Sequence, residues 1–244
     1  MTRKAASEER QYLDEYRPQD YPRPSVAVDL VIFTIIDARL VVLVVRRKEH
    51  PFKGAWVVPG GFVRVGTSAQ DQGEDLDAAA RRELLEETGL DPERVHVEQL
   101  AAFGRAGRDP RMRVISIAYV ALVRPDLAPI VKAGGDAADV RWVSMDELKR
   151  LELGFDHRQI IEAGLMRVRT GLESSSVAFD LVPLTFTIPE LRNVHSIVLD
   201  KDVDPGNFRR KFNRMLEDGL IEQAPGKRIT TSKPATVYRF KRRS

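Results

Sequence analysis

The stretch GGFVRVGTSAQDQGEDLDAAARRELLEETGL, residues 60–90, decides how the rest of the chain is interpreted. Its second half predicts a helix that begins at Asp75, a favourable N-cap, and stops at Gly89. At 100° per residue, four charged side chains of this helix share one broad face: Arg82, Glu83, Glu86 and Glu87. Glutamates on adjacent turns repel one another, so such a face makes sense if a cation lies on it.

Two readings of this acidic face are open from the residues alone. Hard divalent cations such as Mg²⁺ or Mn²⁺ take carboxylate oxygens and usually carry a substrate phosphate as well. The alternative is a solvated helix face in which Arg82 is the internal counter-ion. The four histidines show no spacing typical of metal ligands, so a metal site would have to use carboxylates.

Composition places the chain among folded proteins without disulfides. Of its 244 residues, 43% are hydrophobic and none is cysteine, which excludes thiolate zinc sites and indicates a reducing cytoplasm. The N-terminal sequence MTRKAASEERQYLDEY lacks the apolar segment of a signal peptide. Since no apolar run reaches the length of a membrane span, we expect no membrane partner.

The net charge of +3 hides an asymmetry. From Leu181 to Ser244 the chain carries 13 Lys+Arg against 7 Asp+Glu, a net charge of +6, whereas the first 180 residues carry −3. A basic C-terminal quarter on a mildly acidic body predicts a module that binds a polyanion such as nucleic acid. The alternative is a solvated basic surface.

The segments around the acidic helix predict a mixed sheet with helices, an α+β fold. VAVDLVIFTII (26–36) and RLVVLVVRR (39–47) predict two strands joined by a tight turn. Further strands are expected in four segments: GAWVVPGGF, VHVEQLAAF, RVISIAYVALV and DVRWV. A capping box, Ser144 to Glu147, opens a short helix, and a longer helix is expected over about 157–169.

We expect three parts: an N-terminal arm over 1–20, a body over 21–172 and a C-terminal module over 173–244, with GLESSS (171–176) as the linker. In the module, a capping box at Thr187 opens one helix, and Asp204 followed by proline opens a second. A hairpin is predicted from two strand segments, LIEQ and ATVYRF, with a turn at APGKR (224–228) between them. This order is typical of a winged helix-turn-helix.

The second helix of the module is amphipathic, with an apolar back and an Arg/Asn front. Arginine and asparagine can read guanine and adenine edges in the major groove. The candidate DNA-binding residues are Asn207, Arg209, Arg210, Lys211 and Arg214 on the helix, Lys227 and Arg228 at the expected hairpin tip, and Lys233 beyond it. The alternative is a basic helix packed on the body or on another protein.

The segment FGRAGRDPRMRV (103–114) is rich in arginine, whose planar guanidinium suits phosphate. The candidate ligand-binding residues are Arg105, Arg108, Asp109 and Arg111. A solvated basic loop is the alternative. Trp56 and Phe103 are candidates for stacking on an adenine, with a place in the core as the competing reading.

The segment from Glu74 to Leu90 resembles the Nudix box: Glu74 is followed by seven residues and then by RELLEETGL. The resemblance implies a Nudix fold, a mixed sheet between helices, whose box helix holds Mg²⁺ or Mn²⁺ against a nucleoside diphosphate linked to another group. By position, it makes Glu83, Glu86 and Glu87 the metal or base carboxylates. It also implies that Arg82 orients them by ion pairing and that the Gly61 carbonyl completes the metal shell.

The chain departs from the family pattern before the box helix. Five residues separate the glycine from the first glutamate in the family, but twelve separate Gly61 from Glu74 here. The extra segment, about GTSAQDQ (66–72), lies in a loop, where insertions are tolerated. We therefore expect an intact acidic face and a Gly61 carbonyl that the insert puts at risk. The general base would be Glu83, or Asp109 from the loop after the box.

From about Tyr21 to Phe240, the chain resembles the Nudix-related transcriptional regulators of NAD metabolism. The segments that carry the resemblance are PRPSVAVDLVIF, the Nudix box, GRDPR, TIPELRNVHSIVLDKDVDPGNFRRKF and ATVYRF. The resemblance implies a homodimeric bacterial repressor. Its Nudix domain would bind ADP-ribose or a related nucleotide, and its winged helix would bind a palindromic operator and release it when the ligand binds. Many members have damaged boxes, whereas this chain keeps every box carboxylate. The alternative is a Mg²⁺-dependent hydrolase, an ADP-ribose pyrophosphatase with an accessory C-terminal domain.

Overall fold

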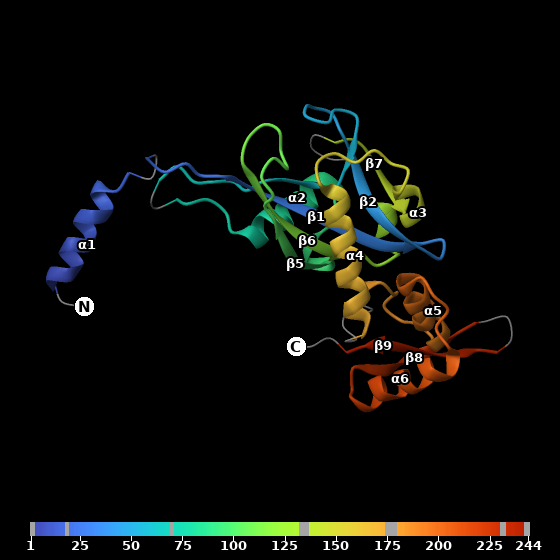
Figure 1. The fold of residues 1–244 in the computed structure, drawn as a ribbon. Helices are drawn as coiled ribbons and strands as arrows, with labels where there is room; N and C mark the ends of the chain where they lie inside the picture. The colour runs from blue at the N-terminus through green and yellow to red at the C-terminus, as the bar shows by residue number, and fades with distance from the viewer. Residues whose placement is uncertain are drawn as a thin grey trace.

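The computed structural model describes residues 3–17, 20–68, 71–131, 137–173, 180–229 and 233–241. Figure 1 shows a sheet with helices on both faces, followed by a small module of two helices and a hairpin. The expected α+β fold is confirmed. An N-terminal helix, α1 (Arg3–Glu15), projects from the body ahead of the sheet. No helix in the described ranges is both long enough and apolar enough to cross a bilayer.

The main sheet is mixed. Its strands are β1 (Ser25–Ile36), β2 (Arg39–Arg47), β3 (Trp56–Val57), β4 (Gly60–Phe62), β5 (His96–Phe103), β6 (Val114–Leu122) and β7 (Ala137–Ser144). They run in the order β3-β2-β1-β6-β5, while β4 pairs with β1 and β7 with β2. The central pair β1 and β6 is parallel, and the other pairs are antiparallel.

Strand β1 separates two apolar layers because alternate side chains leave a strand on opposite faces. Val28, Leu30 and Ile32 pack in the layer that holds the box helix α2 (Leu76–Thr88). Val31 and Phe33 pack in the layer that holds α4 (His157–Glu173). The sheet therefore lies between the box helix and α4, as the Nudix resemblance implies (Figure 1).

Local sequence signals fix several boundaries. Ser144 and Glu147 form the expected capping box at the start of α3 (Met145–Leu148), and Gly89 ends α2 in the left-handed conformation. Helix α4 is longer than expected because its last turn buries Leu172 completely. The first residues of the expected linker are therefore helical, and 174–176 lie outside the described ranges.

The C-terminal module has the predicted order. It contains α5 (Ile188–Leu199), α6 (Pro205–Glu217), β8 (Ile221–Arg228) and β9 (Ala235–Phe240). Thr187 and Glu190 form a reciprocal capping box, and the Asp204 side chain accepts a hydrogen bond from the Asn207 amide. The apolar side of α6 is buried through Phe208, Phe212 and Met215.

The turn predicted at 224–228 is wrong. Strand β8 continues through that segment, and Lys227 and Arg228 pair with residues of β9. The pairing changes register after Gln223, Ala224 is buried, and Gly226 has a φ of 89°. The proline and glycine therefore form an irregularity within the strand instead of reversing the chain. The connection to β9 lies beyond Arg228, partly outside the described residues.

The module shares a core with the α4 side of the sheet. One buried cluster runs from Val31 and Ile161 in the body to Leu191 of α5 and Phe212 of α6. Both α4 and α5 contribute side chains to this cluster, and α5 also lies against β2. The module is thus packed on the body beside α4, instead of being tethered only by a linker (Figure 1).

His195 lies inside this module and is only 2% exposed. Its Nδ1 is 2.9 Å from the Leu191 carbonyl oxygen, and its ring meets the edge of Phe208. Burial, together with the nearby Lys211 ammonium, lowers the pKa of His195 to about 4. Unfolded chains bind a proton on histidine below about pH 6.5, so the stability due to neutral His195 is lost as the pH falls from 6.5 toward 4.

We predict that His195→Gln weakens this pH dependence. Between pH 7 and pH 5, the wild-type protein should lose roughly 2 kcal/mol more unfolding free energy than the variant, measured by urea unfolding. His50→Gln, in an exposed loop, is the control and should keep the wild-type pH dependence. The same pH dependence in His195→Gln and the wild type would contradict this account.

Candidate functional site

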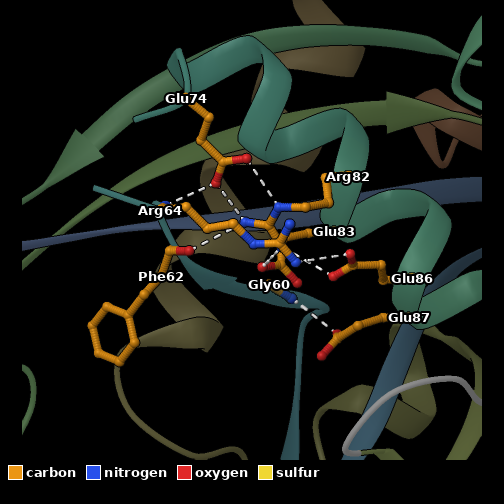
Figure 2. Close-up of polar contacts among 8 residues, drawn as sticks. All are labelled: Gly60, Phe62, Arg64, Glu74, Arg82, Glu83, Glu86 and Glu87. Carbon is orange, nitrogen blue, oxygen red and sulfur yellow. Dashed lines mark hydrogen bonds and ion pairs between the residues drawn. The ribbon is translucent and has the colours of Figure 1, made fainter. Parts of the chain in front are cut away.

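Arg82 is at the centre of the box helix's acidic face (Figure 2). Its guanidinium donates to both carboxylate oxygens of Glu74, at 3.0 and 2.6 Å, and to Glu83 and Glu86. Arg64, from the strand side of the loop, donates to the other oxygen of Glu86 at 3.1 Å. Two arginines therefore neutralise the repulsion among the carboxylates in this structure.

The carboxylates differ in proton affinity. The hydrogen bonds from Arg82 lower the pKa of Glu74 to about 2. Glu83 is 7% exposed, and its burial outweighs the Arg82 contact and raises its pKa. The bidentate contact with Arg111 lowers the pKa of Asp109. Of the two general-base candidates, Glu83 is the stronger base.

Two glycines bring β4 against the box helix. The Gly60 amide donates to Glu87 at 3.0 Å. A Cβ on Gly61 would lie 2.2 Å from Glu83 Oε1, so a side chain there would force the Glu83 carboxylate to move. The inserted loop has thus left Gly61 beside Glu83.

The insert forms a loop that is closed at its base. The Glu74 amide donates to the Arg64 carbonyl at 3.0 Å, and the Arg64 amide donates to the Glu74 side chain at 2.8 Å. Val65 and Gly73 form the next pair outward. Because the two ends meet, the extra residues extend away without changing the register of α2. Residues 69–70 lie outside the described ranges.

The carboxylates have the right donor atoms for a hard cation but are not gathered around one point. Within the described ranges, no three Asp, Glu or His side chains form a group that could hold a metal ion as it stands. Figure 2 shows the reason: the Arg82 guanidinium extends between Glu74 on one side and Glu86 on the other. Glu86 would have to exchange an arginine contact for the ion.

A cavity of about 300 Å³ lies between β1, β2, β4 and the loop 104–113, next to Glu87. This size is at the lower end of the range for small-molecule sites. Five cationic side chains line it: Arg46, Arg47, Lys48, Arg108 and Arg111. Phe62 and Phe155 contribute apolar surface. Four acidic side chains also line it, Asp29, Glu49, Glu87 and Asp109, so the lining carries charges of both signs. Its cationic side and its apolar surface suit a negatively charged ligand with an apolar part.

Buried ion pairs form the cavity floor. Arg108 donates to both oxygens of Asp156, at 2.9 and 2.6 Å, and to Asp29 at 3.3 Å. Ser116 also donates to Asp29. His157 accepts from the Val58 amide at 3.0 Å through Nδ1, and its Nε2 lies 3.6 Å from Asp29. Burial lowers the pKa of His157, which therefore remains neutral at pH 7.

The structure separates the predicted ligand residues. Arg108, Asp109 and Arg111 line the cavity, whereas Arg105 is exposed and does not. Arg111 is held by Asp109 and lies over the Phe62 ring, 5.5 Å from its centroid. It is thus already oriented at the cavity wall.

Sequence reasoning missed Asp29 and His157, which line the cavity, and Asp156, which holds the lining residue Arg108. A lone acid inside the apolar first strand was the available signal for Asp29. The sequence places His157 only at the start of a predicted helix, and α4 does begin there. Trp56 and Phe103 pack against the core and are absent from the cavity lining, which favours the core reading for both.

On α6, Asn207, Arg209, Arg210 and Arg214 are exposed. Lys211 instead directs its ammonium inward and donates to the Leu172 carbonyl of α4 at 2.8 Å.

The basic residues of the hairpin divide in the same way. Lys227 and Lys233 are exposed, whereas Arg228 pairs with Glu190 and donates to the Thr185 carbonyl. Neither Lys227 nor Arg228 is at the hairpin tip, contrary to the prediction.

Comparison with known proteins agrees with this architecture. The NUDIX domain model matches residues 24–164, and the NrtR DNA-binding winged helix domain model matches residues 178–240. The chain is 33% identical to the ADPR-responsive transcriptional repressor NtrR of Acinetobacter baylyi over 234 residues, which cover 96% of this chain and 89% of that protein. The chain belongs to the NrtR family of Nudix-domain transcriptional regulators.

Two solved structures of the family's Shewanella oneidensis NrtR are similar to this chain. The complex with a 27mer DNA has a TM-score of 0.73 at 32% identity and covers 88% of this chain and 93% of that one. The NUDIX domain complexed with ADP ribose has a TM-score of 0.58 at 33% identity, covering 66% and 98%. Hydrolases of the Nudix family generally use a divalent metal.

Proposed function

We propose that this protein is a transcriptional repressor that binds DNA through its winged helix and responds to ADP-ribose bound in its Nudix domain. The observation that carries the proposal is the exposed Asn/Arg face of α6 on a winged-helix fold. Support comes from the full-length similarity to an ADPR-responsive repressor and from the Shewanella relative crystallised with DNA. The target genes would be those of NAD metabolism.

The cavity beside the box helix is the proposed effector site. ADP-ribose carries a diphosphate between two ribose-containing groups, and arginine forks match phosphate oxygens well. Arg46, Arg47 and Arg111 line the cavity and would bind that diphosphate. Arg108 is held in ion pairs on the floor and so orients the site. The Shewanella NUDIX domain in complex with ADP ribose supports this ligand.

The proposed functional division follows the fold. Residues 21–172 would be the effector-binding domain, which holds all of α4 except its last residue, and residues 173–244 would be the DNA-binding module. We further propose a homodimer, because a palindromic operator presents two half-sites to two recognition helices. Operator binding would place the protein in the cytoplasm with the chromosome.

The DNA-binding proposal predicts the effect of a double substitution on α6. Arg210→Ala with Arg214→Ala should weaken operator binding at least about 30-fold, because each base-reading arginine contributes on the order of 1–3 kcal/mol. The affinity for ADP-ribose should not change. Fluorescence anisotropy at fixed salt measures the affinity for operator DNA, and calorimetry measures the affinity for ADP-ribose. Arg239→Ala, an exposed arginine on β9, is the control. Unchanged DNA affinity in the double variant would rule out this face as the reader.

Hydrolysis of ADP-ribose is the second candidate function, favoured by the complete set of box carboxylates. Glu83, Glu86 and Glu87 supply the oxygen donors that Mg²⁺ or Mn²⁺ prefers, with Gly61 next to Glu83. A bound ion would neutralise charge on the diphosphate. Glu83, whose pKa is raised by burial, would accept the proton of the attacking water. Slow hydrolysis and repression are compatible, since hydrolysis would remove the signal.

Glu87→Gln tests the metal role without removing the contact to Gly60, since the amide oxygen still accepts a hydrogen bond. We expect the Mg²⁺-dependent gain in ADP-ribose affinity to disappear and AMP release to fall at least about 10-fold. Calorimetry with and without Mg²⁺, and an AMP-release assay, measure these. Glu93→Gln, which lies off the acidic face, is the control. A variant with the Mg²⁺ response and turnover of the wild type would eliminate this role.

A further inference from the structure

Helix α4 begins at the floor of the proposed effector cavity. The carbonyl of Asp156 accepts hydrogen bonds from the Gln159 and Ile160 amides and so starts the helix. The Asp156 carboxylate is held by Arg108, and both side chains are only 4% exposed. The next residue, His157, lines the cavity. A ligand that changes the contacts of Arg108 therefore acts directly on the first turn of α4.

The other end of α4 is bound to both helices of the winged-helix module. Lys211 of α6 donates to the Leu172 carbonyl in the last turn of α4, at 2.8 Å. In the opposite direction, Arg169 of α4 donates to the Val198 carbonyl in the last turn of α5, at 2.9 Å. One continuous helix of 17 residues, about 25 Å long, thus joins the cavity to the DNA-binding helices (Figure 1).

These two contacts are of a kind that holds helices firmly. The last four carbonyls of a helix have no partner within it, and they carry the negative end of the helix dipole. A buried or half-buried cation that donates to such a carbonyl gives it a hydrogen-bond partner. The same cation also offsets the negative end of the helix dipole. Lys211 also lies 3.5 Å from Nε2 of His195, whose Nδ1 faces the Leu191 carbonyl and whose Nε2 can thus accept.

Lys211 differs from its neighbours on α6 in the direction of its side chain. Arg209, Arg210 and Arg214 are exposed, while Lys211 is half-buried and its ammonium reaches the Nudix side. An ammonium committed to a carbonyl of α4 is not available to a DNA phosphate. The helix period places Lys211 on the shoulder of the DNA-reading face, but its partner is 39 residues earlier in the chain.

We propose that Lys211 is a positioning residue that couples the effector cavity to the recognition helix through the C-terminus of α4, instead of contacting DNA. This inference rests on the proposed function. Ligand binding in the cavity beside Arg108 displaces α4 through the Arg108–Asp156 pair, and the Lys211 and Arg169 contacts carry that displacement to α6 and α5. Loss of either contact uncouples DNA release from ligand binding.

Lys211→Met is the test, measured on the full-length protein with operator DNA. The response factor is the ratio of operator affinities without and with saturating ADP-ribose; allosteric factors are typically about 5–150-fold. We expect the response factor of Lys211→Met to fall to less than about one third of the wild-type value. The slope of log affinity against log salt concentration should stay at the wild-type value. This slope is proportional to the number of protein cations that contact DNA phosphates.

Arg209→Met is the matched control on the same helix. As an exposed candidate for phosphate contact, it should lower the salt slope by about one and leave the response factor at the wild-type value. Lys211→Arg should restore the response, since a guanidinium can also donate to the Leu172 carbonyl. Arg169→Met, which leaves α6 unaltered, should lower the response as Lys211→Met does and keeps the test decisive if Lys211→Met fails to fold.

The outcomes separate this inference from the proposed function. A wild-type response factor in Lys211→Met, or a salt slope lower by about one, would overturn the coupling role of Lys211. A folded Arg169→Met protein with a wild-type response would overturn it as well. If ADP-ribose fails to weaken operator binding in the wild-type protein, the proposed function itself is wrong, and the inference falls with it.

Discussion

The buried contact between Arg108 and Asp156 is the constraint on which the functional architecture depends. It joins the arginine-rich loop to the start of α4, and Asp29 of β1 completes it from the sheet. Removing one partner of such a buried pair leaves an uncompensated charge, at a cost of about 3–5 kcal/mol. Arg108 and Asp29 also line the cavity, and Asp156 starts α4, so the contact that fixes the site also fixes the helix leading away from it.

From that floor, α4 connects two parts that the sequence alone separates. The winged-helix module shares a buried cluster with the α4 side of the sheet, and its recognition helix is bonded to the last turn of α4. On the opposite face of the sheet, Arg82 holds Glu74, Glu83 and Glu86 in a partly neutralised cluster beside Gly61. The proposed effector site therefore lies between an acidic helix, which suits a metal-bound diphosphate, and a helix that leads to the DNA-binding surface.

Local rules predicted what local sequence determines. Helix capping rules predicted the N-caps at Ser144 and Thr187 and the helix end at Gly89. Helix periodicity predicted that the box carboxylates share one face. The turn at 224–228 was wrong because proline and glycine mark a strand irregularity as well as a turn. The carboxylates that hold Arg108 and the Leu172 carbonyl that Lys211 contacts are 39 to 79 residues away in sequence, so periodicity could place the two side chains on a face but could not identify these partners.

In the proposed repressor, the ligand site and the DNA-binding surface are energetically coupled. Coupling is reciprocal, so the most direct measurement is the dissociation constant of ADP-ribose for the free protein and for the protein saturated with operator, at fixed salt. The account predicts weaker ADP-ribose binding in the operator complex, by the same factor by which ADP-ribose weakens operator binding. Equal affinity of ADP-ribose for the free and the operator-bound protein would contradict it.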